Sequence, residues 1–381
     1  MLSVVDTAPL VLDLGLVLVL AAAFGWGARR FRLPAVVGYM LVGLVVSPFT
    51  PGFVADSGQL TVLADIGVVL LLFEVGIEVD VRRIGREYGR LLWLVPLQLL
   101  GGGAIVAALL YAAGFAVFAA LLLGLSVAMS SSVVVVNITR SRNRTTDPVT
   151  DETLLSWSVL QDIYGVAAAA VLLAVFNSGD RSLGASLAGL VGYAVFVGIG
   201  ARILPWILRL IRWEHDIFLI FSVAAGLTWA AIGTVIFNVP MALAAFVAGL
   251  AINGGGDTVA VRTALLPFRD LFAVLFFVVV GSLVDLRQLQ EALPIAAVLT
   301  LCVVVFKSGL IAVLARLAKL RARPLQLGVG LGQMGEFSFV LASVGVAAGV
   351  LTQGQFVGVL LTVVLTIVAT TTLVRIGAIS R

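Results

Sequence analysis

The sequence predicts an all-α membrane protein of about 13 transmembrane helices, and its composition, its apolar runs and the placement of its basic residues all support this. Of the 381 residues, 61% are hydrophobic and only 12% are charged, against roughly 45–50% and 25% in a soluble domain. Apolar stretches of about 20 residues, the length that crosses a bilayer, recur from end to end. The 40 glycines suit closely packed membrane helices.

The expected spans are the apolar runs that lie between polar or Gly/Pro breaks. Because no linker or charge block interrupts the series, we expect one membrane domain over residues 1–381. The arginines of the first run follow it, as in a retained helix rather than a signal peptide. The predicted spans are 10–28, 34–47, 60–79, 91–111, 115–139, 153–176, 184–208, 215–236, 239–253, 265–284, 294–318, 325–349 and 355–376.

The basic residues predict the orientation. Seven connections and ends on one side hold 20 of the 24 Lys and Arg residues, whereas the other side holds only Arg181 and Arg287. Cytoplasmic loops carry such an excess, so the carboxyl end is expected inside and the amino end outside. The arginines form no dense run, and we expect no nucleic-acid partner. The single cysteine, Cys302, permits no intramolecular disulfide and is expected to pack passively.

Ionisable residues at bilayer depth mark a function or a partner, because their burial in the membrane costs several kcal/mol. Within the predicted helices, Asp162, Lys307 and Glu336 lie about 14–16 Å from the cytoplasmic ends, so three distant segments bring charge to one level. Glu74 lies about 8 Å deep, within reach of the interface or of loop arginines. Arg202 lies near a helix end and can extend to the interface.

Asp162 and Lys307 predict an exchange site. A buried ion pair of purely structural value is the alternative, although such pairs seldom offset their desolvation. Burial raises the proton affinity of a carboxylate and a nearby ammonium lowers it, so that a proton and a cation compete near neutral pH.

Two predicted spans contain breaks. Span 115–139 carries Ser130, Ser131 and Ser132 about 12 Å from the cytoplasmic face, and the Gly-rich segment 328–337 weakens any regular helix in span 325–349. Interruptions of this kind, one in each half, indicate a binding site between inverted repeats. Close packing of unbroken helices through small residues is the alternative.

Several motifs, in this order and spacing, are similar to those of the cation:proton antiporter superfamily, specifically its Kef-type branch. The resemblance covers nearly the whole chain. Its motifs are PAVVGYMLVGLVVSP (34–48), LLLFEVGIEVD (70–80), SSSVVV (130–135), LQDI (160–163), AFVAG (245–249), LFFVVVG (275–281) and GEFSFV (335–340).

The resemblance implies a sodium/proton-antiporter-like fold and an exchange of K⁺ or Na⁺ for H⁺ by alternating access, in a homodimer that is expected in a prokaryotic plasma membrane. Inverted repeats, with two crossing broken helices, form a core of about 91–176 and 294–376. The scaffold and dimerisation helices cover about 10–79 and 184–284. Asp162 matches the shared cation and proton site, Gln161 the preceding polar position and Lys307 the charge partner.

Two departures from the family pattern matter. Electrogenic members carry two adjacent aspartates, whereas Gln161-Asp162 suggests electroneutral exchange. Many Kef-type chains continue into a cytoplasmic nucleotide-binding domain; the sequence ends at Arg381 and leaves open whether such a domain, or a partner subunit, exists.

The sequence determines neither the choice between K⁺ and Na⁺ nor the direction of transport. Ser130 and Ser131 are candidate ligands beside Asp162, whereas Ser132 and Glu336 are structural or secondary candidates.

A cation channel of the same fold, opening for ligand-gated K⁺ efflux, is the competing interpretation. The string Val36-Val37-Gly38-Tyr39 is similar to a potassium filter, but Met40 stands where a filter has glycine. An intramembrane enzyme is disfavoured, because no paired-histidine motif is present and His215 lies at a cytoplasmic helix start. We expect no enzyme activity, no cofactor and no metal other than the transported cation.

Overall fold

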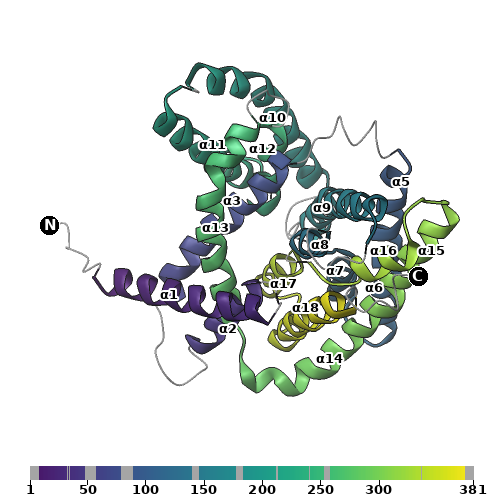
Figure 1. Ribbon diagram of the computed structural model, residues 1–381. Coiled ribbons are helices and arrows are strands. Elements are labelled where there is room, and N and C mark those ends of the chain that lie inside the picture. Colours follow the sequence, from purple (N-terminus) through teal and green to yellow (C-terminus); the bar gives the residue numbers. More distant parts are fainter. Residues whose placement is uncertain are drawn as a thin grey trace. The chain divides into compact units, whose positions relative to one another are not determined.

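The computed structural model describes residues 8–31, 33, 35–47, 57–78, 89–139, 146–176, 183–211, 213–239, 241–252, 258–335 and 337–373. All regular structure within these residues is helical, which confirms the predicted fold class (Figure 1). Each predicted span coincides with a helix, or with a pair of helices that an interruption separates. Among the described residues, seven helices are long and apolar enough to cross a membrane, and three shorter apolar helices accompany them.

The chain forms two compact units. The first consists of the described residues of Met1–Val79 and Ser178–Val284, and the second of those of Asp80–Asn177 and Asp285–Arg381. The functional division into a core and a scaffold stays a prediction.

The first unit is held together by close contact between helix backbones. A Cβ atom added at Gly76 would lie 2.2 Å from Phe246 O, and one at Gly249 would lie 2.1 Å from Phe73 O. Only glycine permits so close an approach, which is the packing that the glycine content predicted. The helices of this unit are α1 (Ala8–Arg30), α2 (Ala35–Val45), α3 (Ser57–Glu78), α10 (Leu183–Ile211), α11 (His215–Val235), α12 (Met241–Ile252) and α13 (Thr258–Ser282).

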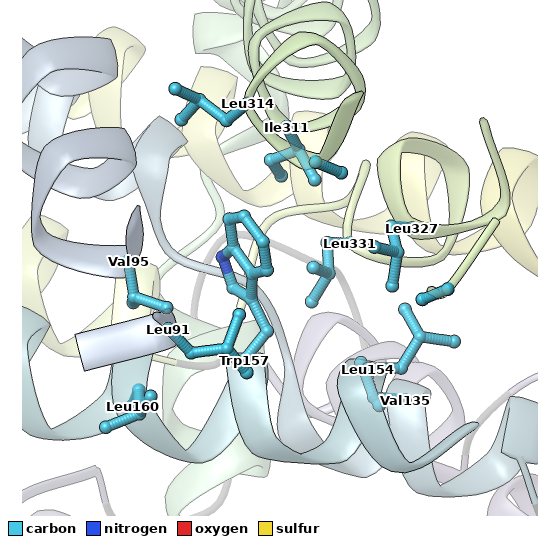
Figure 2. Close-up of a cluster of buried hydrophobic side chains, with 12 residues drawn as sticks. Leu91, Val95, Val135, Leu154, Trp157, Leu160, Ile311, Leu314, Leu327 and Leu331 are labelled. Carbon is cyan, nitrogen blue, oxygen red and sulfur yellow. The ribbon is translucent and has the colours of Figure 1, made fainter. Parts of the chain in front are cut away.

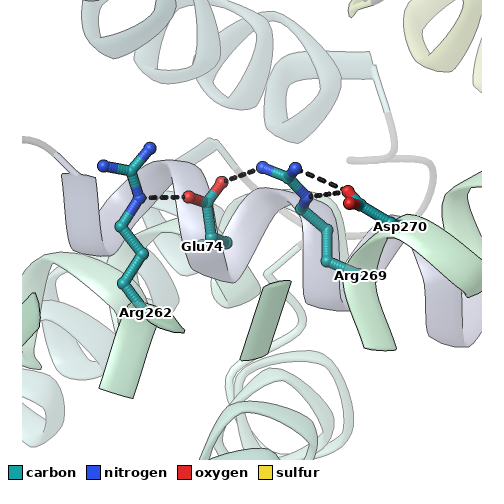
Figure 3. Close-up of polar contacts among 4 residues, drawn as sticks. All are labelled: Glu74, Arg262, Arg269 and Asp270. Carbon is teal, nitrogen blue, oxygen red and sulfur yellow. Dashed lines mark hydrogen bonds and ion pairs between the residues drawn. The ribbon is translucent and has the colours of Figure 1, made fainter. Parts of the chain in front are cut away.

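Glu74 of α3 is buried and pairs with two arginines of α13 (Figure 3). Its Oε1 lies 2.6 Å from Arg262 Nε and its Oε2 lies 2.9 Å from Arg269 Nη1; Arg269 also pairs with Asp270. The sequence analysis expected loop arginines within reach of Glu74 and counted these two in a connection over 262–269, which overlaps the span predicted from residue 265. The helix instead begins at Thr258 and includes both arginines, whose partly exposed side chains reach the buried Glu74.

The second unit contains the two interrupted spans. Its helices are α5 (Leu91–Pro96), η1 (Leu97–Gly101), α6 (Gly102–Ala112), α7 (Val117–Ala128), α8 (Ser132–Thr139), α9 (Pro148–Phe176), η2 (Leu286–Gln288), α14 (Leu289–Leu301), η3 (Cys302–Lys307), α15 (Ser308–Leu317), α16 (Pro324–Gly330), α17 (Phe337–Ala347) and α18 (Gln353–Leu373). The segments η1 and η3 are π-helical turns within otherwise continuous helices. Such turns often mark functional sites, because they redirect side chains.

Helix α9 begins at Pro148, before the predicted residue 153, because Asp147 caps it. The Asp147 carboxylate accepts hydrogen bonds from Thr150 N and Thr150 Oγ1, each 3.0 Å long. Proline at the first helical position lacks only an N–H that would have no helical partner. Arg323, which precedes α16, lies 3.1 Å from Asp147 Oδ2 and joins the start of α16 to the start of α9.

A cluster of buried apolar side chains surrounds Trp157 (Figure 2). It joins α5, α8, α9, α15 and α16, so the helices that carry the site pack on one another at this point. In a membrane this stability comes from van der Waals packing rather than from removal of apolar surface from water. The labelled members are Leu91, Val95, Val135, Leu154, Trp157, Leu160, Ile311, Leu314, Leu327 and Leu331.

Candidate ion-binding site at the crossing of two interrupted helices

The interruptions between α7 and α8 and between α16 and α17 cross and bind each other. The Gly335 N–H donates to Met129 O at 3.2 Å. Gln333 forms a reciprocal pair with the Ser131 backbone, its Oε1 accepting from Ser131 N at 2.9 Å and its Nε2 donating to Ser131 O at 3.2 Å. The Ser130 hydroxyl donates to Leu331 O at 2.8 Å. The crossing of two broken helices is therefore confirmed.

Close approach at the crossing requires glycine at one position. A Cβ atom at residue 335 would lie 2.7 Å from Ser130 O, inside van der Waals contact with the main chain. The non-helical backbone at the crossing is therefore buried within protein, the setting in which irregular backbone is tolerated at membrane depth.

Lys307, at the end of η3, lies where two helices end. Its buried ammonium donates to Met129 O at 2.7 Å and to Gln333 O at 2.6 Å, and these residues follow the carboxyl ends of α7 and α16. A cation is favourable there, because the carbonyls at a helix carboxyl end carry partial negative charge. The sequence predicted Lys307 as the charge partner of Asp162; the structure gives its ammonium two main-chain carbonyls as partners, and its pairing with Asp162 stays a prediction.

The structure joins Gln161 to the end of α7. Its Nε2 donates to Gln98 Oε1 at 2.5 Å and to Ala128 O at 3.2 Å, and Ala128 is the last residue of α7. Gln98, on η1, also donates from its Nε2 to Ala128 O at 3.2 Å and accepts from Trp157 Nε1 at 3.3 Å. Four polar groups from α9, α7 and η1 therefore meet beside the interruption.

Asp162 follows Gln161 and is 3% exposed. It lies about 21 Å along α9 from Pro148, deeper than the predicted 14 Å, because the helix starts earlier. Helix α9 packs against α7 and α8, so Asp162 is carried on the helix that lines the first interruption.

The hydroxyls of Ser130 and Ser131 form hydrogen bonds with the backbone of the interrupted helices. Ser131 Oγ accepts a hydrogen bond from Val134 N at 3.4 Å at the start of α8, and Ser130 is bound to Leu331 as described above. Ser132 is the first residue of α8 and is half-buried. The Ser130 and Ser131 oxygens keep further lone pairs, and their role as cation ligands stays a prediction. Glu336 lies outside the described residues.

Gln98 was missed by the sequence reasoning, which considered ionisable groups at membrane depth but not neutral amides. A signal was present: Gln98 is a lone polar residue in an apolar run, two residues after Pro96. Proline frees a backbone carbonyl one turn earlier, and irregular helix turns cluster at functional sites.

A helical membrane protein in which two interrupted helices cross beside a buried lysine and a buried carboxylate has the architecture of a secondary transporter. The chain belongs to the family of transmembrane sodium/hydrogen exchangers, which it matches over residues 16–378. The predicted membership of the cation:proton antiporter superfamily is thereby confirmed.

Two relatives and one solved structure illustrate this membership. The chain is 31% identical, over 352 residues, to YbaL of Escherichia coli, a candidate cation/proton antiporter, covering 88% of this chain and 62% of YbaL. It is 30% identical over 335 residues to the iron transporter MagA of Paramagnetospirillum magneticum, covering 86% of this chain and 76% of MagA. The fold is similar to that of MjNhaP1, a sodium proton antiporter of Methanocaldococcus jannaschii, with a TM-score of 0.76, 19% identity and 98% of each chain covered.

Proposed function

We propose that this protein exchanges a monovalent cation, K⁺ or Na⁺, for H⁺ across a membrane by alternating access. The observation that carries the proposal is the buried carboxylate of Asp162 in the middle of α9, next to an amide that is bound to the end of interrupted helix α7. One carboxylate that holds either a proton or a cation couples the two fluxes, since neither ligand binds while the other occupies it.

Lys307 contributes to the crossing itself. The Lys307 ammonium is engaged by two carbonyls and stabilises the crossing in both occupancy states of Asp162. With Gln161 neutral beside a single acidic group, the proposed exchange is one charge for one, and therefore electroneutral.

The test is proton flux in proteoliposomes, read by a pH-sensitive dye inside the vesicles under imposed gradients of Na⁺, K⁺ or, because of the relative MagA, Fe²⁺. We expect Na⁺ or K⁺ to drive proton flux in the native protein, and Asp162→Asn to abolish it while melting stays cooperative. Normal flux in Asp162→Asn would contradict the assignment of the site.

Two further measurements test the mechanism. An imposed membrane potential is expected to leave the rate unchanged; a changed rate would show that a second group carries charge. The cation flux is expected to saturate, and its apparent affinity to weaken as the pH falls. Cation current without proton counterflow would establish a channel instead.

The proposal includes a homodimer in a prokaryotic plasma membrane, with the amino end outside and the carboxyl end inside. The basic residues support this orientation, and the family resemblance supports the dimer. Labelling of cysteines introduced at positions 181 and 319 by an impermeant reagent tests the orientation. Labelling from outside at position 319 but not at position 181 would reverse it.

A further inference from the structure

Gln98 is a buried amide whose environment leaves it one orientation. It is 0% exposed and lies on η1, where the π-helical turn directs it towards α7 and α9. Its Nε2 faces Ala128 O, which can only accept a hydrogen bond, and its Oε1 faces the Trp157 indole N–H, which can only donate one. The two contacts fix which end of the amide is oxygen.

The orientation of Gln98 in turn determines the orientation of the Gln161 amide. Since Gln98 presents an oxygen, Gln161 must present its NH₂ group to it, and the second proton of that group goes to Ala128 O. Both donors of Gln161 are thereby used. Its carbonyl Oε1 must then point away from Gln98 and Ala128.

The Gln161 carbonyl oxygen has no protein donor among the described residues. It is fully buried, and within the described part of the chain no hydrogen bond reaches it. A buried carbonyl without a partner costs about 1–3 kcal/mol, so such an arrangement calls for a ligand. On the same helix, Asp162 follows directly, and an amide oxygen with a carboxylate is a suitable ligand pair for a monovalent cation.

We propose that Gln98 is a positioning residue that sets the cation affinity of the exchanger, by holding the Gln161 amide with its carbonyl oxygen directed to the ion. This deepens the proposed function and rests on it. Gln98 does not touch the cation; it acts only through Gln161. A proton on Asp162 needs no amide oxygen, so the cation affinity depends on Gln98 and the proton affinity does not.

The first test is the apparent KM for the driving cation, Na⁺ or K⁺, in proteoliposomes. Gln98→Leu frees the Gln161 amide to rotate, and we expect the KM to rise about fivefold while the maximal rate changes less than about twofold. At a fixed cation concentration, inhibition by protons is expected to extend to higher pH. An unchanged KM would overturn the proposal.

The second test separates positioning from general stability. If Gln98 acts through Gln161, adding Gln98→Leu to Gln161→Leu is expected to leave the KM where Gln161→Leu alone puts it. Additive increases in the KM would overturn the proposal. Tyr193→Phe is the matched control, since it removes a buried hydroxyl from the other unit, where that hydroxyl lies 2.7 Å from Ala244 O and 3.1 Å from Trp229 O. It is expected to lower the melting temperature without changing the KM.

Trp157→Phe keeps the test decisive if Gln98→Leu does not fold, because it removes only the indole donor and keeps the ring in its apolar cluster. We expect a rise of about twofold in the KM; no rise in this variant would overturn the proposal.

Asp162→Asn distinguishes failure of this proposal from failure of the proposed function. If that variant exchanges normally, the site is wrong; if it is inactive and the Gln98 and Trp157 variants keep the native KM, only the role of Gln98 is wrong.

Discussion

Replacement of Lys307 by methionine tests whether its ammonium holds the crossing together. Methionine keeps most of the length and apolar volume of the side chain but removes the ammonium, and with it the hydrogen bonds to Met129 O and Gln333 O. Met129 O still accepts from Gly335 N, so the group that loses its partner is Gln333 O, to which the described residues offer no other donor.

The magnitude follows from these contacts. A buried carbonyl without a donor costs about 1–3 kcal/mol, and each helix end that loses its compensating cation costs about 0.3–1 kcal/mol more. Relief of the buried charge offsets part of this loss. We expect the free energy of unfolding to fall by about 2 kcal/mol, which for a chain of 381 residues lowers the melting temperature by about 3 °C.

The assay is thermal melting of the purified protein in detergent, followed by tryptophan fluorescence. Thr362→Val is the control, since it removes a buried hydroxyl of α18 that bonds to Gly358 O at 2.8 Å, and its melting temperature is expected to fall by less than about 1 °C. Native-like melting of Lys307→Met would refute the reasoning. If Asp162→Asn restores the melting temperature of Lys307→Met, the principal partner of Lys307 is Asp162 rather than the two carbonyls.

Three further predictions concern packing and charge. Gly335→Ala is expected to displace the crossing, because its Cβ would lie 2.7 Å from Ser130 O. The free energy of unfolding should fall by about 1–3 kcal/mol and exchange should be impaired. Exchange at the native rate would contradict this. Glu74→Gln leaves Arg262 and Arg269 without their shared buried carboxylate, and we expect a lower melting temperature but an unchanged cation KM; a changed KM would connect Glu74 with transport. Partial burial raises the pKa of Asp147, but hydrogen bonds from Thr150 and the charge of Arg323 outweigh it, so that the pKa is below 3.8. The stability that this carboxylate contributes is therefore present above pH 3.8 and is lost as the pH falls through its folded pKa; Asp147→Asn should flatten melting against pH in that window, and an unchanged profile would contradict it.

The sequence by itself determined the helical membrane class, the approximate position of each span and the two interruptions. These follow from local properties, because a bilayer requires about 20 apolar residues per helix and glycine weakens a helix wherever it stands. Asp162 and Lys307 were identified for the same reason, because a charged residue inside an apolar run can be recognised from the sequence. The start of α9 could also have been predicted from Asp147-Pro148, which is a local capping signal.

Only the tertiary structure decided what these residues contact. Lys307 binds the carbonyls of Met129 and Gln333. Every residue has such a carbonyl, so the sequence does not show which ones an interruption leaves without a helical partner. The orientation of Gln161 likewise depends on Gln98, which lies 63 positions away along the chain and reaches Gln161 and Trp157 only because α5 and η1 pack against α9. Amides and carbonyls act through direction and distance, and these are properties of the packed helices rather than of the sequence pattern.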